Sequence, residues 1–242
     1  MTDVPTTTTP SDGLRRGEAL VEVNDVFKSY RRGPEEVHAL VGAHLTLRVG
    51  EVVALMGPSG SGKTTLLNVL CGWEHPDGGS VAWPGSPNGD LPAERRPWRD
   101  IAIVPQDLGL LEELSVRENV GLPVRLAEMR DDPQWAARID RLLEVFGLEP
   151  YADRQPGEIS LGEQQRVALS RAMILLPKLL LADEPTGHQD AEWARTVFRG
   201  FRWAASRGTT SLIATHSREF LRFVDRVVLI RDGRLHEDDA PR

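Results

Sequence analysis

Gly57-Pro58-Ser59-Gly60-Ser61-Gly62-Lys63-Thr64 fits the phosphate-binding template G-x-x-x-x-G-K-[S/T] at every fixed position. The apolar run before it, Glu51 to Met56, predicts a buried strand, and Thr65 to Leu70 after it predicts a helix. In such a loop the backbone N–H groups turn toward a phosphate, and the helix N-terminus adds a positive dipole end. Lys63 supplies a charge for the β- and γ-phosphates, and Thr64 supplies a hydroxyl for Mg²⁺. The stretch predicts a P-loop that binds a nucleoside triphosphate.

The composition is that of a globular chain of 242 residues, with 40% hydrophobic and 27% charged residues. No apolar run approaches the ~18 residues of a membrane span, and the N-terminus lacks a signal pattern, so we expect a cytoplasmic location. The net charge of −7 argues against nucleic acid as a partner, and we expect none. The single Cys71 cannot form an internal disulfide, which agrees with a reducing compartment.

The chain divides into a predicted disordered tail, residues 1–18, and one domain, residues 19–242. Two-residue alternation from Leu20 to Val26 and from Val37 to Val49 predicts an antiparallel layer before the P-loop. Buried strands are then predicted at 101–104, 179–182 and 210–215, a closing hairpin at 227–236, and helices at 132–146 and after Ser160. Strands that alternate with helices around a P-loop predict an α/β fold with a doubly wound, parallel-sheet core and a helical insertion.

Polar side chains stand where three of the buried strands end. Leu179 to Ala182 run directly into Asp183 and Glu184, of which one can bind Mg²⁺ and the other can polarise a water molecule. Gln106 and His216 follow two other strands, where each could bond the γ-phosphate, the metal or the attacking water. The other histidines have no metal-ligand spacing, so we expect no structural metal site.

Tyr30, at the end of the first strand, has two interpretations. It is either a half-buried strand-end aromatic, which the residues alone favour, or a surface on which a nucleotide base stacks.

In this order the motifs resemble the ATP-binding subunit of ABC transporters, from about Leu20 to Glu237. The resemblance implies a P-loop NTPase with an antiparallel β subdomain and a helical subdomain at about 107–176. It implies adenine stacking for Tyr30, Walker A for residues 57–64, the Q-loop for Gln106, and Walker B for Leu179 to Glu184. It also implies the signature for Ile159 to Arg166, the D-loop for Asp190 and the H-loop for His216.

The roles implied by this resemblance fall into three groups. The catalytic residues are Lys63, Gln106, Glu184 and His216, and the Mg²⁺ ligands are Thr64, Gln106 and Asp183. The ATP-binding residues are Tyr30, Gly57, Pro58, Ser59, Gly60, Ser61, Gly62, Lys63, Thr64, Thr65, Gln106, Ser160, Gly162, Glu163 and His216.

The family mechanism implies two such domains that pair head to tail, with each ATP between one chain's Walker A and the other's signature. ATP closes the dimer, which drives separate transmembrane permease subunits from the cytoplasmic face of the cell membrane. Glu184 to Gly187 and Arg117 to Pro123 resemble the lipoprotein-release, macrolide-export and cell-division subfamily, whereas the loop between Trp83 and Arg99 departs from it.

Two alternatives stay open at this point. One is a soluble ABC ATPase of translation or DNA repair, and the other is a regulatory subunit that turns ATP over slowly. Leu161 replaces the first signature glycine, where positive φ is costly for leucine, and His188 and Gln189 replace small and apolar D-loop residues. These departures suggest a slower site, either in a homodimer or in a pair with a different ATPase. The retained Ser160, Gly162 and Glu163, and the like-with-like pairing that the subfamily implies, favour the slow homodimer.

Overall fold

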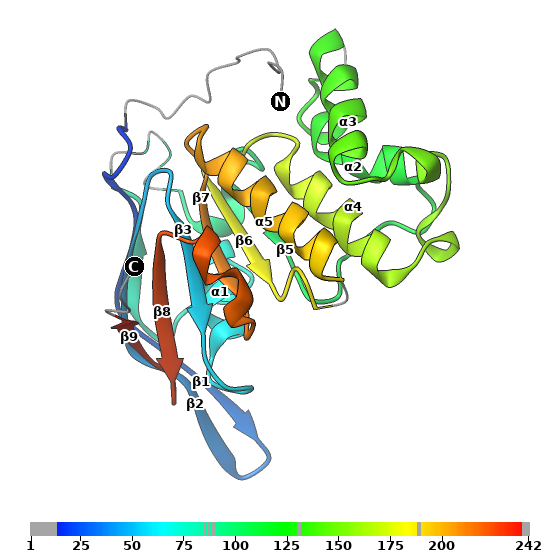
Figure 1. Ribbon diagram of the computed structural model, residues 1–242. Helices are drawn as coiled ribbons and strands as arrows, with labels where there is room; N and C mark the ends of the chain where they lie inside the picture. Colours follow the sequence, from blue (N-terminus) through cyan, green and yellow to red (C-terminus); the bar gives the residue numbers. More distant parts are fainter. Residues whose placement is uncertain are drawn as a thin grey trace.

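The computed structural model describes residues 14–84, 86, 88, 91–129, 132–187 and 190–238. Within these ranges the chain forms two sheets, with helices against both faces of the larger one (Figure 1). The smaller sheet has the order β2-β1-β4 and consists of β1 (Ala19–Arg32), β2 (Glu35–Arg48) and β4 (Gly78–Ala82). The larger has the order β5-β6-β7-β3-β8-β9 and consists of β3 (Val52–Met56), β5 (Ile101–Val104), β6 (Leu179–Asp183), β7 (Thr210–Ala214), β8 (Arg226–Arg231) and β9 (Arg234–Asp238).

The larger sheet is parallel except for β9, which pairs antiparallel with β8 as the predicted hairpin. Strands β3, β6 and β7 are buried at every position, which is why they read as continuous apolar runs. Alternate side chains face two separate cores. Leu181 and Leu212 belong to the cluster that contains α1, whereas Leu180 belongs to the cluster that contains α4 and α5.

The α-helices are α1 (Lys63–Cys71), α2 (Val116–Leu126), α3 (Pro133–Val145), α4 (Leu161–Met173) and α5 (Ala191–Ala205). Between these elements lie short 3₁₀ helices, η1 (Ala93–Arg95), η2 (Glu149–Tyr151), η3 (Pro156–Glu158) and η4 (Arg218–Phe223). Helix α1 contacts both β2 and β6, so it lies between the two sheets, and Cys71 is buried there. Helices α2, α3 and α4 form the predicted helical region (Figure 1).

Helix ends agree with the capping signals in the sequence. Asp132 caps α3 by accepting a hydrogen bond from the Gln134 N–H, with Pro133 at the first helical position. Ser160 caps α4 through the predicted box with Glu163. The structure adds a second capping box at the start of α2, between Ser115 and Glu118.

The first strand is longer than predicted. β1 continues past Val26 to Arg32 and pairs with β2 over its whole length, through register shifts near Asp25, whose φ is +52°. A two-residue pattern breaks at such bulges, so the alternation in the sequence marked only the first half. Of the predicted tail, residues 14–18 are described, and the N–H of Gly17 bonds the carbonyl of Val49 at 3.0 Å.

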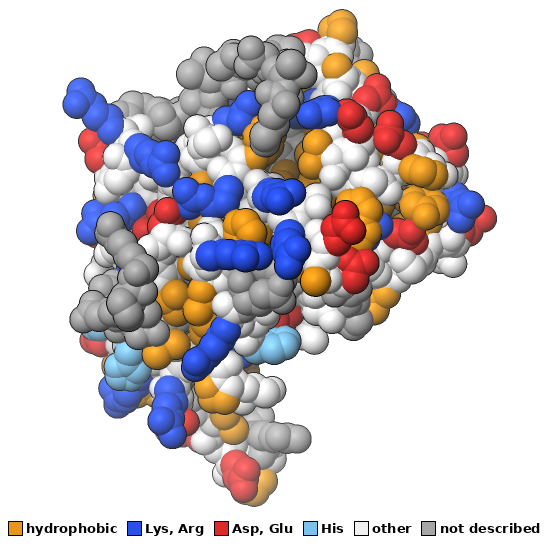
Figure 2. All heavy atoms as spheres, viewed as in Figure 1, with side chains coloured by type: hydrophobic (Ala, Val, Ile, Leu, Met, Phe, Trp, Pro, Cys, Tyr) orange, Lys and Arg blue, Asp and Glu red, His pale blue; other side chains and the backbone are white. Residues whose placement is uncertain are grey.

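Basic side chains gather on one face although few are adjacent in the sequence. Figure 2 shows Lys and Arg side chains grouped over α5 and η4. Helical periodicity collects Arg195, Arg199 and Arg202 on α5, and Arg202 pairs with Asp225 at 2.7 Å. Among the described residues no helix is long and apolar enough to cross a bilayer.

Candidate functional site

The P-loop is packed so closely that two of its glycines have no room for a side chain. A Cβ at Gly57 would lie 2.2 Å from the carbonyl oxygen of Ile230, and one at Gly62, whose φ is +107°, would lie 2.2 Å from that of Ala39. The Lys63 ammonium donates to the carbonyl oxygens of Gly57 and Pro58, at 2.9 and 3.0 Å. This close packing and the two bonds fix the conformation of the loop and hold the Lys63 ammonium against its backbone.

Ser61 carries an orphaned polar atom inside this loop. Ser61 is 5% exposed, and its hydroxyl has no hydrogen-bond partner among the described residues. A buried hydroxyl without a partner is unfavourable unless a ligand satisfies it, and a phosphate oxygen is an acceptor of the right kind. The P-loop residues thus fit a bound phosphate chain.

Walker A and Walker B meet at one hydrogen bond. Thr64, the second residue of α1, donates its hydroxyl to Oδ2 of Asp183 at the end of β6, at 2.7 Å. Burial raises the pKa of the Asp183 carboxyl above its ordinary value. The bond from Thr64 lowers this pKa, and the negative charge of Glu184 raises it further. Burial and the charge of Glu184 thus outweigh the bond from Thr64 and the positive charge of Lys63.

These residues fit Mg²⁺. Hydroxyl and carboxylate oxygens are the ligands that Mg²⁺ takes, and a dication would compensate the buried charge of Asp183. Gln106 lies exposed two residues beyond Val104, which pairs with Ala182, so it stands at the same sheet edge as Asp183. No group of three or more His, Cys, Asp and Glu side chains within the described ranges is arranged to hold a metal, so the predicted ligand set needs Thr64 and Gln106.

Glu184 and His216 form the second pair of the site. The His216 Nδ1 lies 3.0 Å from Oε1 of Glu184, and the imidazole is largely exposed while the carboxylate is mostly buried. Glu184 has a φ of +50°, and its N–H donates to the carbonyl of Ala214 on the neighbouring strand β7. This conformation costs a non-glycine residue about 1–3 kcal/mol, so the surrounding structure must hold Glu184 in it.

Tyr30 lies beside the P-loop helix. Its hydroxyl donates to Glu74 and lies within hydrogen-bond reach of Thr65, and the residue is 37% exposed. Burial, together with the bond to Glu74, raises the pKa of the phenol to about 12. Nothing in the sequence indicated Glu74, because the two residues meet only through the fold.

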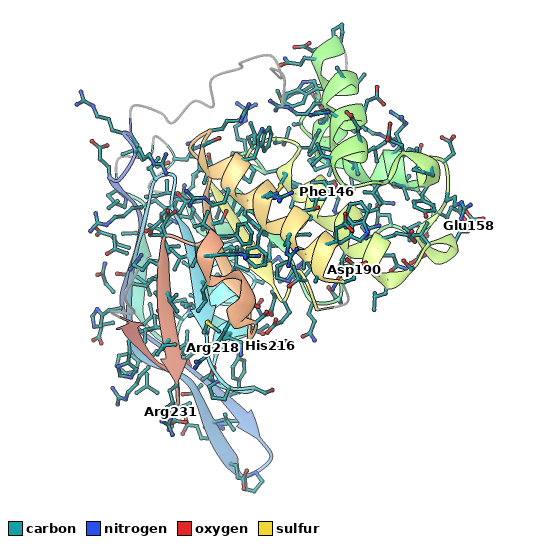
Figure 3. All side chains as sticks on the ribbon, viewed as in Figure 1. Phe146, Glu158, Asp190, His216, Arg218 and Arg231 are labelled. Atoms are coloured by element: carbon teal, nitrogen blue, oxygen red, sulfur yellow. The ribbon has the colours of Figure 1, made fainter. Side chains whose placement is uncertain are left out.

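The signature residues lie at the other end of the molecule. Figure 3 places Glu158, two residues before Ser160, at the outer end of the helical region, far from His216. Ser160, Gly162 and Glu163 occupy the first turn of α4 and its cap. One chain therefore brings together Tyr30, the P-loop, Gln106, Asp183, Glu184 and His216, but not the signature.

The expectation of a strained backbone at Leu161 is wrong. Leu161 is the first residue of α4, and it is not among the described non-glycine residues with positive φ. The capping box sets an ordinary helical conformation there, so leucine costs no backbone strain. Its side chain is 45% exposed. Asp190 caps α5 through the N–H groups of Glu192 and Trp193, and His188 and Gln189 lie outside the described residues.

The fold and the site define an α/β P-loop nucleotide hydrolase with its acidic residues at the carboxyl ends of parallel strands. The family model described as ABC transporter matches residues 40–187, which is more than half of the chain. The chain therefore belongs to the ABC transporter family, and it is an ATP-binding, ATP-hydrolysing cassette of that family.

Two relatives and one solved structure illustrate the similarity. The lipoprotein-releasing system ATP-binding protein LolD 1 of Rhodospirillum rubrum is 41% identical, over 90% of this chain and 98% of the relative. The macrolide export ATP-binding/permease protein MacB of Syntrophobacter fumaroxidans is 40% identical, over 88% of this chain and 31% of the relative. A dimeric post-hydrolysis state of the ATP-binding cassette MJ0796 with ADP and Pi has a TM-score of 0.78 at 31% identity, and covers 90% of this chain and 98% of that one.

Proposed function

We propose that this chain is the ATPase subunit of a transporter of the lipoprotein-releasing and macrolide-export type, which drives separate transmembrane subunits by ATP-dependent closure of a cassette dimer. The proposal rests on the 2.7 Å bond that joins Thr64 of Walker A to Asp183 of Walker B. It places the end of the phosphate loop against the buried acid, with Glu184 as the next residue. The relatives that match over nearly the whole chain include a lipoprotein-releasing ATP-binding protein.

In the proposed site the P-loop N–H groups and Lys63 hold the β- and γ-phosphates, and Tyr30 stacks on adenine. Thr64, Asp183 and Gln106 would hold Mg²⁺, which would neutralise charge on the phosphate oxygens. Glu184 orients the attacking water, and His216, through its contact with Oε1, fixes the carboxylate. Water attacks the γ-phosphorus in line while the bond from the γ-phosphorus to the β,γ-bridging oxygen breaks, and the products are ADP, inorganic phosphate and one proton.

The second half of the site comes from a second copy of the chain. Glu158, which shortly precedes the cap of α4, lies far from His216 (Figure 3), so we infer that the α4 N-terminus does not complete the ATP site of its own chain. Head-to-tail pairing places Ser160, Gly162 and Glu163 of one protomer against the γ-phosphate of the other, where the helix dipole attracts the anion. Closure and opening then act on the permease subunits at the cytoplasmic face of the membrane.

The test compares Glu184→Gln with the wild type and with Glu192→Gln, an exposed acid in the first turn of α5. We expect Glu184→Gln to bind ATP, to elute as a dimer when ATP is present, and to lose hydrolysis by about 10³-fold, since the group that orients water is gone. Glu192→Gln should behave as the wild type. Hydrolysis by Glu184→Gln at the wild-type rate would refute the assignment.

The membrane partnership is tested by purification from detergent-solubilised membranes. We expect integral membrane subunits to copurify with the tagged chain, and a single kind of ATPase chain to be present. Recovery of the chain with ribosomes or DNA, and without membrane subunits, would favour the soluble alternative.

A further inference from the structure

Trp193 joins α5 to the helical region at two points. It is the third residue of α5, and its own N–H is fixed by the Oδ1 of the capping residue Asp190 at 2.9 Å. Its half-buried ring extends to the far end of α3, where a Cβ at Gly147 would lie 2.2 Å from the ring carbon Cη2. Gly147 has a φ of +61°, so the chain leaves α3 in a left-handed turn that leaves room for the indole.

The guanidinium of Arg166 stacks on the same ring. The Cζ of Arg166 lies 4.1 Å from the centroid of Trp193, and Arg166, on the second turn of α4, is only 6% exposed. A cation over an indole face is attracted more strongly where water is excluded. Burial lowers the pKa of this guanidinium, and the negative charges of Glu163 and Asp190 act in the opposite direction.

These contacts form a continuous path between two helix N-termini. It runs from Asp190, the cap of α5, through Trp193 to Arg166 on α4, three residues beyond Glu163, which forms the capping box of α4 with Ser160. Asp190 follows Glu184, the last residue of Walker B, by six residues, and the cap of α4 belongs to the signature. The contact of Arg166 with the Trp193 ring therefore connects the helix that follows Walker B to the signature helix.

We propose that Trp193 is a positioning residue for ATP hydrolysis, which holds the first turn of α4 at the orientation in which the signature meets the partner's ATP. The catalytic use of this orientation rests on the proposed dimeric site. The packing itself does not depend on it, because every contact lies within one chain. Loss of the ring should loosen α4 and slow the catalytic step, while ATP binding to Lys63 and the P-loop is preserved.

Trp203 provides a matched control on the same helix. It is also half-buried and is covered by an arginine, with the Cζ of Arg207 at 4.4 Å from its centroid, but it lies at the opposite end of α5. Trp203→Ala removes the same ring and the same kind of cation contact without touching α4. Trp193→Phe keeps an aromatic face for Arg166 and tests whether the face is what matters.

The first measurement uses the nucleotide-free chain and amide hydrogen exchange. We expect Trp193→Ala to speed exchange of the Gln164 and Gln165 amides by about tenfold, since local opening of α4 no longer breaks the cation contact. Trp203→Ala should leave these two amides at the wild-type rate, and Trp193→Phe should restore most of the protection. Unchanged exchange in Trp193→Ala would overturn the proposal.

The second measurement separates kcat from KM in the purified ATPase. Trp193→Ala should lower kcat about tenfold, with KM for ATP within about twofold of the wild type. Arg166→Lys keeps the charge but not the planar stack, so combining it with Trp193→Ala should lower kcat no further. An equal loss in Trp203→Ala, or a parallel rise in KM, would overturn the positioning role. A wild-type chain without ATP turnover would refute the proposed function instead, while the exchange measurement still decides the packing.

Discussion

Replacement of Asp183 by Asn should stabilise the nucleotide-free protein while it removes the response to Mg²⁺. Asp183 is 6% exposed and accepts one described hydrogen bond, from Thr64 at 2.7 Å. Glu184 adds a like charge beside it, and the nearby Lys63 ammonium is already bonded to two P-loop carbonyls. The wild-type fold therefore holds a carboxylate in a place that favours a neutral group.

The size of the effect follows from what asparagine keeps and what it removes. The side-chain oxygen remains to accept from Thr64, so the bond of about 1 kcal/mol is preserved. A fully uncompensated buried charge costs about 3–5 kcal/mol, and Lys63 offsets a part of that. We expect a gain of about 1–2 kcal/mol, which for a chain of this length raises Tm by about 2–8 °C.

Thermal unfolding with EDTA and with Mg²⁺ plus ATP tests both halves of the argument. In EDTA the Asp183→Asn variant should melt above the wild type. With Mg²⁺ and ATP the wild type should gain stability by mass action, and the variant should gain clearly less. Thr64→Val, which removes the donor, is the companion variant. If Asp183→Asn melts below the wild type in EDTA, the carboxylate is compensated and the inferred metal site loses its main support.

The remaining predictions concern Tyr30 and the first turn of α4. Tyr30→Ala should weaken ATP binding about tenfold in a fluorescent-nucleotide titration, whereas Tyr30→Phe should retain it, because the ring face matters and the bond to Glu74 does not. Equal losses would implicate the hydroxyl. Leu161→Gly should raise the ATPase rate of the assembled complex, because it removes an exposed side chain from the proposed dimer face. A lower or unchanged rate would show that the dimer accommodates the leucine. Burial alone would raise the pKa of Glu163, but its bonds with Ser160 outweigh burial, so the folded pKa is lowered. This carboxylate therefore stabilises the fold fully above its unfolded pKa of about 4.3, and the stabilisation is lost as pH falls through the lower folded pKa. Glu163→Gln should cost about 1 kcal/mol at pH 7, and this difference in urea unfolding should shrink at pH 3. A pH-independent difference would contradict it.

The local motifs were readable from the sequence because each depends on residues that are neighbours along the chain. The glycine spacing of residues 57–64 specifies a loop that only a few backbone shapes allow, and four buried residues before Asp183 specify a strand end. The capping box of Ser160 and Glu163 is likewise a three-residue relation, and the structure has it. Parallel strands bring their carboxyl ends to one edge, so the placement of Gln106, Asp183 and His216 at the same edge of the sheet could be expected.

Contacts between distant segments needed the tertiary structure. The bond from Thr64 to Asp183 spans 119 positions, and no pattern in the sequence fixes its length. Likewise, Glu74 on Tyr30, and Arg166 and Gly147 on Trp193, are set by how the sheets and helices pack.

Leu161 illustrates the difference most directly. A glycine in the family pattern suggested a backbone that leucine could not adopt, but the cap at Ser160 starts an ordinary helix there. The sequence by itself determined the P-loop, the acidic strand end and the class of nucleotide hydrolase, because local spacing restricts local backbone. The tertiary structure alone decided which side chains meet across the chain and which conformations are strained, because those depend on the packing of segments that the sequence separates.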